Sequence, residues 1–146
     1  MALSQQKFRE IVFQLLYSFD FSEAEQEDIC ALMMYQLAIT KKILLQALER
    51  KEKVQKRLSE IDRLIAESSV SYDFQRIPRI EKNILRLGAY ELLFDDEIPP
   101  KVSIAEAIRL SRKFATPEGA TFVNAVLDAI YKNSSLVQTK KDKADI

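Results

Sequence analysis

The spacing of the apolar residues constrains this chain most, because it follows the helical repeat along most of the sequence. Near the N-terminus, Phe8, Ile11, Val12 and Leu15 recur at helical intervals, which places their side chains on one helix face. Later segments repeat this spacing, and no segment alternates as a strand would. The 146 residues include only 2 Gly and 4 Pro, too few for the closely spaced turns of a β-sandwich or barrel. We therefore predict an all-α fold with about six or seven helices.

Local signals predict several helix ends. Ser4 can cap the first helix, because its hydroxyl can accept a hydrogen bond from a free backbone N–H group. Ser103 and Glu106 have the spacing of a capping box, which predicts a helix start at Ser103. Thr116 followed by Pro117 has the cap and the first-turn proline of a last helix.

The middle of the sequence gives weaker boundaries. Apolar residues keep the helical spacing over residues 29–65 with no Gly or Pro between them, so two helices and one long rod are both compatible with the pattern. We expect a bend or short turn at residues 47–53, because a single rod would exceed the usual length of a globular helix. Residues 68–75 are polar and form a predicted hinge. The prediction is a single domain over residues 1–133 with packed halves at 1–67 and 76–133, then a polar tail at 134–146.

One glycine lies inside a predicted helix. Pro78 suits the first turn of this helix, Pro99 and Pro100 prevent its continuation, and Gly88 falls in its interior. A glycine there costs roughly 1 kcal/mol relative to alanine, and it usually lets another backbone approach closely. We therefore predict that this helix is central in the fold.

The composition argues against catalysis. The sequence has no His, which excludes Ser/His/Asp and Cys/His nucleophile pairs and zinc sites with His ligands. The single cysteine, Cys30, cannot form an internal disulfide or a multi-cysteine metal cage, which favours a reducing compartment. No Gly-rich phosphate loop is present. We predict a protein that is not an enzyme and that uses no cofactor and no metal.

Charge and hydropathy favour a protein that acts by surface recognition in the cytoplasm. Lys plus Arg and Asp plus Glu are both 22, so the chain is not a uniformly basic nucleic-acid binder, although a local basic face is compatible with this balance. Residues 41–57 carry seven cations and two acidic residues, which we interpret as a solvated helix face. No signal peptide and no run of about eighteen apolar residues occurs, which predicts a cytoplasmic protein without a membrane span.

Cations and aromatic rings on the first and last helices suggest a specific ligand. Lys7 and Arg9 lie close in sequence to Tyr17. Tyr17 and Phe122 could stack on unpaired bases while the cations contact phosphate. The alternative is that both rings pack in the core, which is the commoner use of an aromatic residue at helical spacing.

Four segments carry a resemblance to a known family. In chain order they are KFREIVFQLLYSF (7–19), LRLGAYELLF (85–94), IPPKVSIAEAIRLSRKF (98–114) and FVNAVLD (122–128). They resemble the NusB transcription antitermination factors, whereas residues 23–75 match little beyond the helical pattern. The resemblance implies the NusB fold of two packed helical halves. It also implies binding of boxA single-stranded RNA in ribosomal RNA transcripts together with NusE, a small-subunit ribosomal protein, in a complex that helps RNA polymerase resist premature termination.

The resemblance assigns residues to two surfaces. The expected RNA-binding residues are Lys7, Arg9, Gln14, Tyr17, Phe122 and Asn124, and the expected NusE-binding residues are Arg86, Tyr90 and Glu91. One departure concerns residues 4–9, where the family often has an arginine-rich run and this chain keeps only Lys7 and Arg9. We therefore expect the protein alone to have reduced electrostatic affinity for RNA.

Two other functions are compatible with the sequence. One is a stand-alone RNA-binding helical domain related to the N-terminal domain of ribosomal RNA cytosine methyltransferases, which we expect to be followed by a Rossmann-like domain with a Gly motif that this sequence does not contain. The other is a helical protein-interaction module without RNA binding, for which salt-dependent RNA binding and a contribution from Tyr17 are not expected. A monomer and a homodimer are both compatible with the resemblance.

Overall fold

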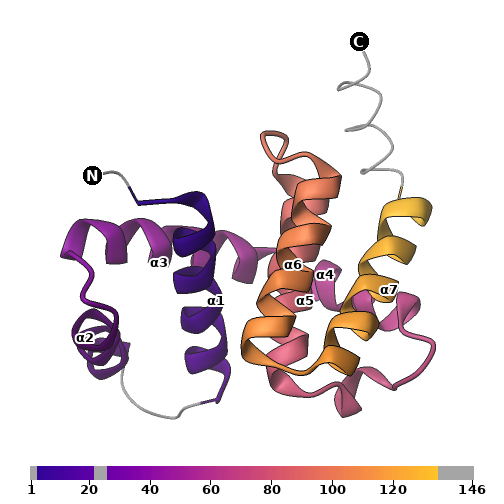
Figure 1. Cartoon of the computed structure of the whole chain (residues 1–146), viewed down its shortest axis with the longest axis horizontal. Helices are drawn as coiled ribbons and strands as arrows, with labels where there is room; N and C mark the ends of the chain where they lie inside the picture. The colour runs from indigo at the N-terminus through magenta and orange to yellow at the C-terminus, as the bar shows by residue number, and fades with distance from the viewer. Residues whose placement is uncertain (1–2, 22–25, 135–146) are drawn as a thin grey trace. The chain divides into compact units, whose positions relative to one another are not determined.

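The computed structural model describes residues 3–21 and 26–134, and this part of the chain is helical without any strand (Figure 1). Its elements in chain order are α1 (Gln5–Phe21), α2 (Gln26–Leu37), α3 (Lys41–Lys56), α4 (Leu58–Ser68), the short 3-10 helix η1 (Phe74–Arg76), α5 (Arg79–Phe94), α6 (Pro100–Phe114) and α7 (Pro117–Asn133). The all-α prediction is confirmed, with seven α-helices in the described part. From residue 135 onward, the predicted polar tail lies outside the described residues. None of the described helices combines the length and the apolar character needed to cross a membrane.

The chain divides into two compact units between Lys56 and Arg57. The predicted hinge at residues 68–75 therefore lies inside the second unit, where it connects α4 to α5. The reason is that α4 packs on α5 and α7, with Ile61 and Ile65 completely buried, so α4 belongs to the second core.

The predicted bend at residues 47–53 is wrong, because α3 runs without interruption through this stretch. Ala47 and Val54 are both fully buried, so one continuous helix face carries the packing. Instead, α3 ends at Lys56 and α4 begins after Arg57. A second break in the helical chain follows the end of α2. There, Ala38 adopts a left-handed conformation with φ of 51°, and the Ile39 N–H donates to the Met34 carbonyl at 3.3 Å. This pattern is the helix ending in which glycine normally occupies the left-handed position.

In the first unit, α1 packs mainly on α3, and α2 packs on both of these helices (Figure 1). Its completely buried side chains include Ile11 and Leu15 of α1 and Val54 of α3. The predicted cap of α1 is confirmed, because the Lys7 N–H donates to Ser4 Oγ at 3.1 Å. This bond fixes the start of the helix that carries four of the expected RNA-binding residues.

In the second unit, α5 packs against α4, α6 and α7 (Figure 1). The central position predicted from Gly88 is confirmed, but the groups that approach this glycine are side chains and not backbone. A Cβ atom at Gly88 would lie 2.9 Å from Leu127 Cδ1 and 3.5 Å from Ala107 Cβ. The missing side chain therefore lets α6 and α7 both pack closely on α5.

The two predicted starts of α6 and α7 had different outcomes. The capping box at Ser103 is wrong: α6 begins at Pro100, since proline is well suited to the first helical position. Ser103 is buried inside the helix, and its Oγ has no hydrogen-bond partner in the described part of the chain. Glu106 pairs instead with Arg109, at 2.7 Å. The cap of α7 is confirmed, because the Gly119 N–H donates to Thr116 Oγ1 at 2.9 Å.

Candidate functional site

The expected RNA-binding residues are divided between the two units. Lys7, Arg9, Gln14 and Tyr17 lie on α1 in the first unit, whereas Phe122 and Asn124 lie on α7 in the second.

The four residues on α1 differ in exposure. Lys7, Gln14 and Tyr17 are half-buried, whereas Arg9 is only 8% exposed. The Tyr17 ring stacks on Phe13, with 6.2 Å between the ring centroids and 26° between the planes, and Phe13 is buried. This stacking anchors the Tyr17 ring to the core, although the residue as a whole is only half-buried.

On α7, Phe122 is half-buried and Asn124 is exposed. The Phe122 ring meets the ring of Tyr72 edge to face, with 5.2 Å between the centroids and 81° between the planes. Tyr72 comes from the connection between α4 and α5 and is 49% exposed. Tyr72 was not predicted from the sequence, because residues 68–75 were interpreted only as a polar hinge. The presence of two aromatic residues, Tyr72 and Phe74, in that polar segment was the available signal.

The three residues expected to bind NusE are all buried. Arg86, Tyr90 and Glu91 lie on α5 and are 9% exposed or less. The Tyr90 ring lies 5.8 Å from the ring of Phe94, centroid to centroid. The side chains of these three residues are thus held within the second unit and offer little surface of their own.

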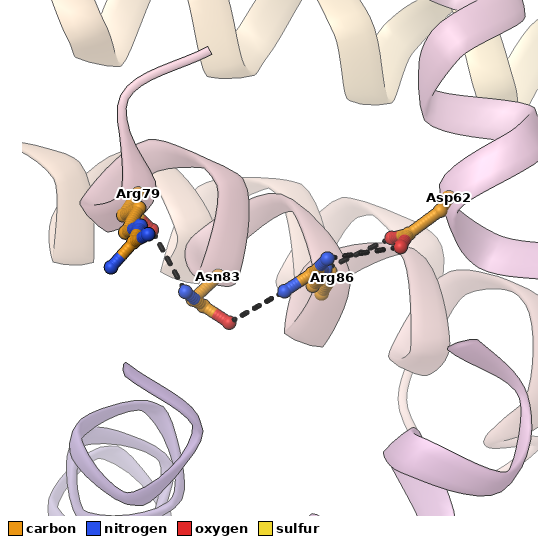
Figure 2. A network of polar contacts seen from close by, with 4 residues as sticks. All are labelled: Asp62, Arg79, Asn83 and Arg86. Atoms are coloured by element: carbon orange, nitrogen blue, oxygen red, sulfur yellow. Dashed lines mark hydrogen bonds and ion pairs between the residues drawn. The ribbon is translucent and has the colours of Figure 1, made fainter. Parts of the chain in front are cut away.

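Arg86 forms the centre of a polar network between α4 and α5 (Figure 2). Its Nε and Nη2 atoms each donate to a carboxylate oxygen of Asp62, both at 2.9 Å. Its Nη1 donates to Asn83 Oδ1 at 3.3 Å, and Asn83 Nδ2 donates to the Arg79 carbonyl at 2.9 Å. We call Asp62, Arg79, Asn83 and Arg86 the Arg86 network. A bidentate pair of this kind fixes the orientation of the two helices as well as their separation.

The basic segment at residues 41–57 is mostly a solvated helix face, as predicted. Its exposed cations are Lys41, Lys42, Lys53, Lys56 and Arg57. Lys51 differs from these, because it is only 5% exposed and its Nζ lies 3.9 Å from the centroid of the Phe19 ring. Burial lowers the pKa of Lys51. This lysine therefore supports the contact between α3 and α1 and does not belong to the solvated face.

A buried carboxylate lies at the start of α7. Glu81 of α5 is 9% exposed, and a Cβ atom at Gly119, in the first turn of α7, would overlap Glu81 Oε1. The glycine therefore makes room for the carboxylate. Burial raises the pKa of Glu81, because it disfavours the charged form.

We expect Glu81→Gln to stabilise the protein increasingly as the pH rises. The raised pKa means that the folded state holds its proton to a higher pH than the unfolded chain does. The stability linked to this group is thus fully present at low pH and is lost as the pH rises through the raised pKa. Glutamine does not titrate, so the gain should be measurable in urea unfolding curves between about pH 4 and about pH 8.

Glu118→Gln is the matched control for the Glu81 prediction. Glu118 is exposed and lies in the first turn of α7, the turn that Glu81 contacts through Gly119. Glu118→Gln therefore removes a carboxylate charge at this helix end, but the carboxylate that it removes is not buried. A stability difference between Glu81→Gln and the parent that stayed constant with pH would contradict the prediction.

The sequence of these helices matches a known protein family. The model of the NusB family matches residues 6–132, which include every described helix except the first residue of α1 and the last residue of α7. The chain belongs to the NusB family. A transcription antitermination protein NusB of Chlamydia pneumoniae is 36% identical over 132 residues, which are 90% of this chain and 82% of that protein.

Solved NusB structures share the fold. The structure of T. maritima NusB is similar with a TM-score of 0.81 at 30% identity, and the match covers 97% of this chain and 99% of that one. A chain from a crystal structure of the antitermination factors NusB and NusE in complex with dsRNA is similar with a TM-score of 0.76 at 27% identity, covering 89% of this chain and 97% of that one. The NusB fold expected from the sequence is therefore confirmed.

Proposed function

We propose that this protein is a transcription antitermination factor that binds RNA together with NusE. The observation that carries the proposal is the family match over residues 6–132, joined to the likeness with a chain from the NusB and NusE complex with dsRNA. The RNA is of boxA type in ribosomal RNA transcripts, and the complex acts on RNA polymerase so that it resists premature termination. This role requires recognition of partners and no catalysis.

The proposed RNA-binding residues have complementary chemistry. Lys7 supplies a cation for phosphate, Gln14 and the exposed Asn124 supply hydrogen-bonding groups, and Tyr17 and Phe122 supply ring surface for bases. Arg9 remains in the proposed set, although its burial reduces the surface that it can offer. This arrangement supports binding through a few placed groups and little general charge.

We assign Arg86, Tyr90 and Glu91 an indirect role in NusE binding. Because all three are buried, they act by holding α5 in position within the second unit. The Arg86 network does this by tying α5 to α4. NusE then contacts the exposed parts of the surface that these residues support.

The proposed function is tested by titrating a boxA-like single-stranded RNA with the protein, with and without NusE, at two salt concentrations. We expect weak binding by the protein alone, because residues 4–9 contain only Lys7 and Arg9 as cations and Arg9 is buried. NusE should strengthen the binding. Tight sequence-specific binding without NusE would contradict the first expectation, and no binding in either state would contradict the function.

In the same titration, Tyr17→Ala and Phe122→Ala should each weaken RNA binding by roughly 1–3 kcal/mol, the range measured for loss of a base-stacking ring. Tyr35→Ala is the control for Tyr17, since Tyr35 lies on α2 in the same unit and is 86% exposed. Urea unfolding of each variant separates stacking from packing. If Tyr17→Ala lowered stability while the folded variant bound RNA normally, the stacking role of Tyr17 would be wrong.

A further inference from the structure

The connection between α4 and α5 places an aromatic residue against α7. The proposed function gives this residue no role. Tyr72 lies in this connection, and its ring meets Phe122 edge to face at 5.2 Å between centroids. Tyr72 is nevertheless 49% exposed. About half of the surface of Tyr72 therefore stays in solvent while its ring contacts Phe122.

The angle between the two rings determines what they can bind. The planes cross at 81°, so one ring presents its edge to the face of the other. The ring that presents its edge uses neither of its own faces in this contact. Proteins that bind single-stranded RNA stack unpaired bases on such faces, and this interaction tolerates any base sequence. The crossed geometry therefore leaves the faces of one ring uncovered by the other ring.

Two hydrogen bonds and a buried side chain hold the connection in place around Tyr72. Ser69 Oγ donates to the Tyr72 carbonyl at 2.6 Å, and the Arg76 N–H donates to the Asp73 carbonyl at 2.8 Å. Ile77, at the end of η1, is 2% exposed and anchors the far end. Because the segment is already ordered by these contacts, a ligand that binds Tyr72 does not bear the full entropy cost of fixing it.

Cations follow Tyr72 at the end of the connection and in the first turn of α5. Arg76 and Arg79 are exposed, and Lys82 Nζ lies 4.4 Å from the centroid of the Phe74 ring. The exposed acidic residue among them is Asp73, whereas Glu81 is buried. Aromatic rings with cations nearby are the combination that binds the bases and the phosphates of a single strand.

We propose that Tyr72 is a further base-stacking residue and that it forms one platform with Phe122. The proposal rests on the proposed function, because it assigns a further residue to the same RNA. It places the contact in the α4–α5 connection, within the second unit, and its ligand is an unpaired base of a single-stranded RNA.

The test compares five variants in complex with NusE, Phe122→Ala among them, titrated with a fluorescently labelled boxA-like single-stranded RNA. Tyr72→Ala and Tyr72→Leu should each weaken binding about 5- to 150-fold, the loss expected for one stacked base. Tyr72→Phe should bind as the parent does, because it keeps the ring face. Tyr35→Ala, which removes a more exposed tyrosine from α2, should also leave binding unchanged.

Tyr72→Leu separates stacking from packing, because leucine can still cover Phe122 but has no flat face. If Tyr72→Leu bound RNA within twofold of the parent while Phe122→Ala lost affinity, the role of Tyr72 would be overturned and the proposed function would stand. If the parent complex itself did not bind the RNA, both proposals would be overturned. Urea unfolding of the same variants confirms that each is folded under the titration conditions.

Discussion

Arg86→Met is expected to lower the free energy of unfolding by about 3 kcal/mol. The substitution keeps an apolar stem but removes both charge-assisted hydrogen bonds to the Asp62 carboxylate and the donor to Asn83 Oδ1. Breaking a buried ion pair from one side costs about 3–5 kcal/mol, because the remaining charge is left without compensation. The Arg86 and Asp62 side chains are 11% and 23% exposed, so water screens part of the effect and the lower end of that range applies.

Urea unfolding with two controls tests this expectation. Arg63 of α4 pairs with Glu67 at 3.0 Å, and both side chains are 59% exposed, so Arg63→Met should change stability by less than about 1 kcal/mol. Adding Asp62→Ala to Arg86→Met should cost less than the sum of the two single changes, since both remove the same pair. Equal effects of Arg86→Met and Arg63→Met would show that the Arg86 network contributes no more than a surface pair.

Gly88→Leu is expected to lower the free energy of unfolding by about 2–3 kcal/mol. A Cβ atom alone would lie 2.9 Å from Leu127 Cδ1, so Leu127 must shift before the rest of the new side chain is placed. Inserting extra methylenes into a packed core typically costs about 1–3 kcal/mol. The better helix propensity of leucine returns less than about 1 kcal/mol, and it does not offset the clash with both α6 and α7.

Gly88→Ala and a compensating change complete the experiment. Alanine adds only the Cβ atom, so its propensity gain and the shift of Leu127 should nearly cancel. Combining Gly88→Leu with Leu127→Ala should recover part of the lost stability, because the new side chain gains room where the old one is removed. Unchanged stability of Gly88→Leu would mean that α5 and α7 do not pack closely at this position.

Helix ends could be predicted from the sequence where a side chain near the boundary determines them. Ser4 and Thr116 cap helices as expected, because each hydroxyl bonds a backbone N–H only three residues ahead. The end of α2 was not predicted, because the residue in the left-handed conformation is Ala38 and not the glycine that usually occupies this position. The start at Ser103 was wrong because Pro100 begins the helix one turn earlier. Pro100 and Ser103 each indicate a helix start, and their spacing alone does not show which of the two starts the helix.

The candidate site was predictable only in its helical parts. Placing Tyr17 on the first helix and Phe122 on the last requires only the periodicity of each segment. The exposure of each residue depends on packing between helices, and this is why the burial of Arg9 and Arg86 was not foreseen. The contact of Arg86 with Asp62 and that of Phe122 with Tyr72 join separate elements. Nothing in the local sequence around either residue identifies its partner.

The Tyr72–Phe122 pair and the packing at Gly88 both need α7, which is synthesised after the other helices of the second unit. Tyr72 leaves the ribosome long before Phe122, and the groove at Gly88 is filled by Leu127 of the same last helix. Contacts between residues so far apart in sequence form only after the intervening chain is available. While α7 is still in the exit tunnel, a nascent chain has Gly88 of α5 without Leu127 packed against it and a Tyr72 ring without its neighbour. The second unit thus acquires its closed core and its two-ring surface together, once α7 is free to pack.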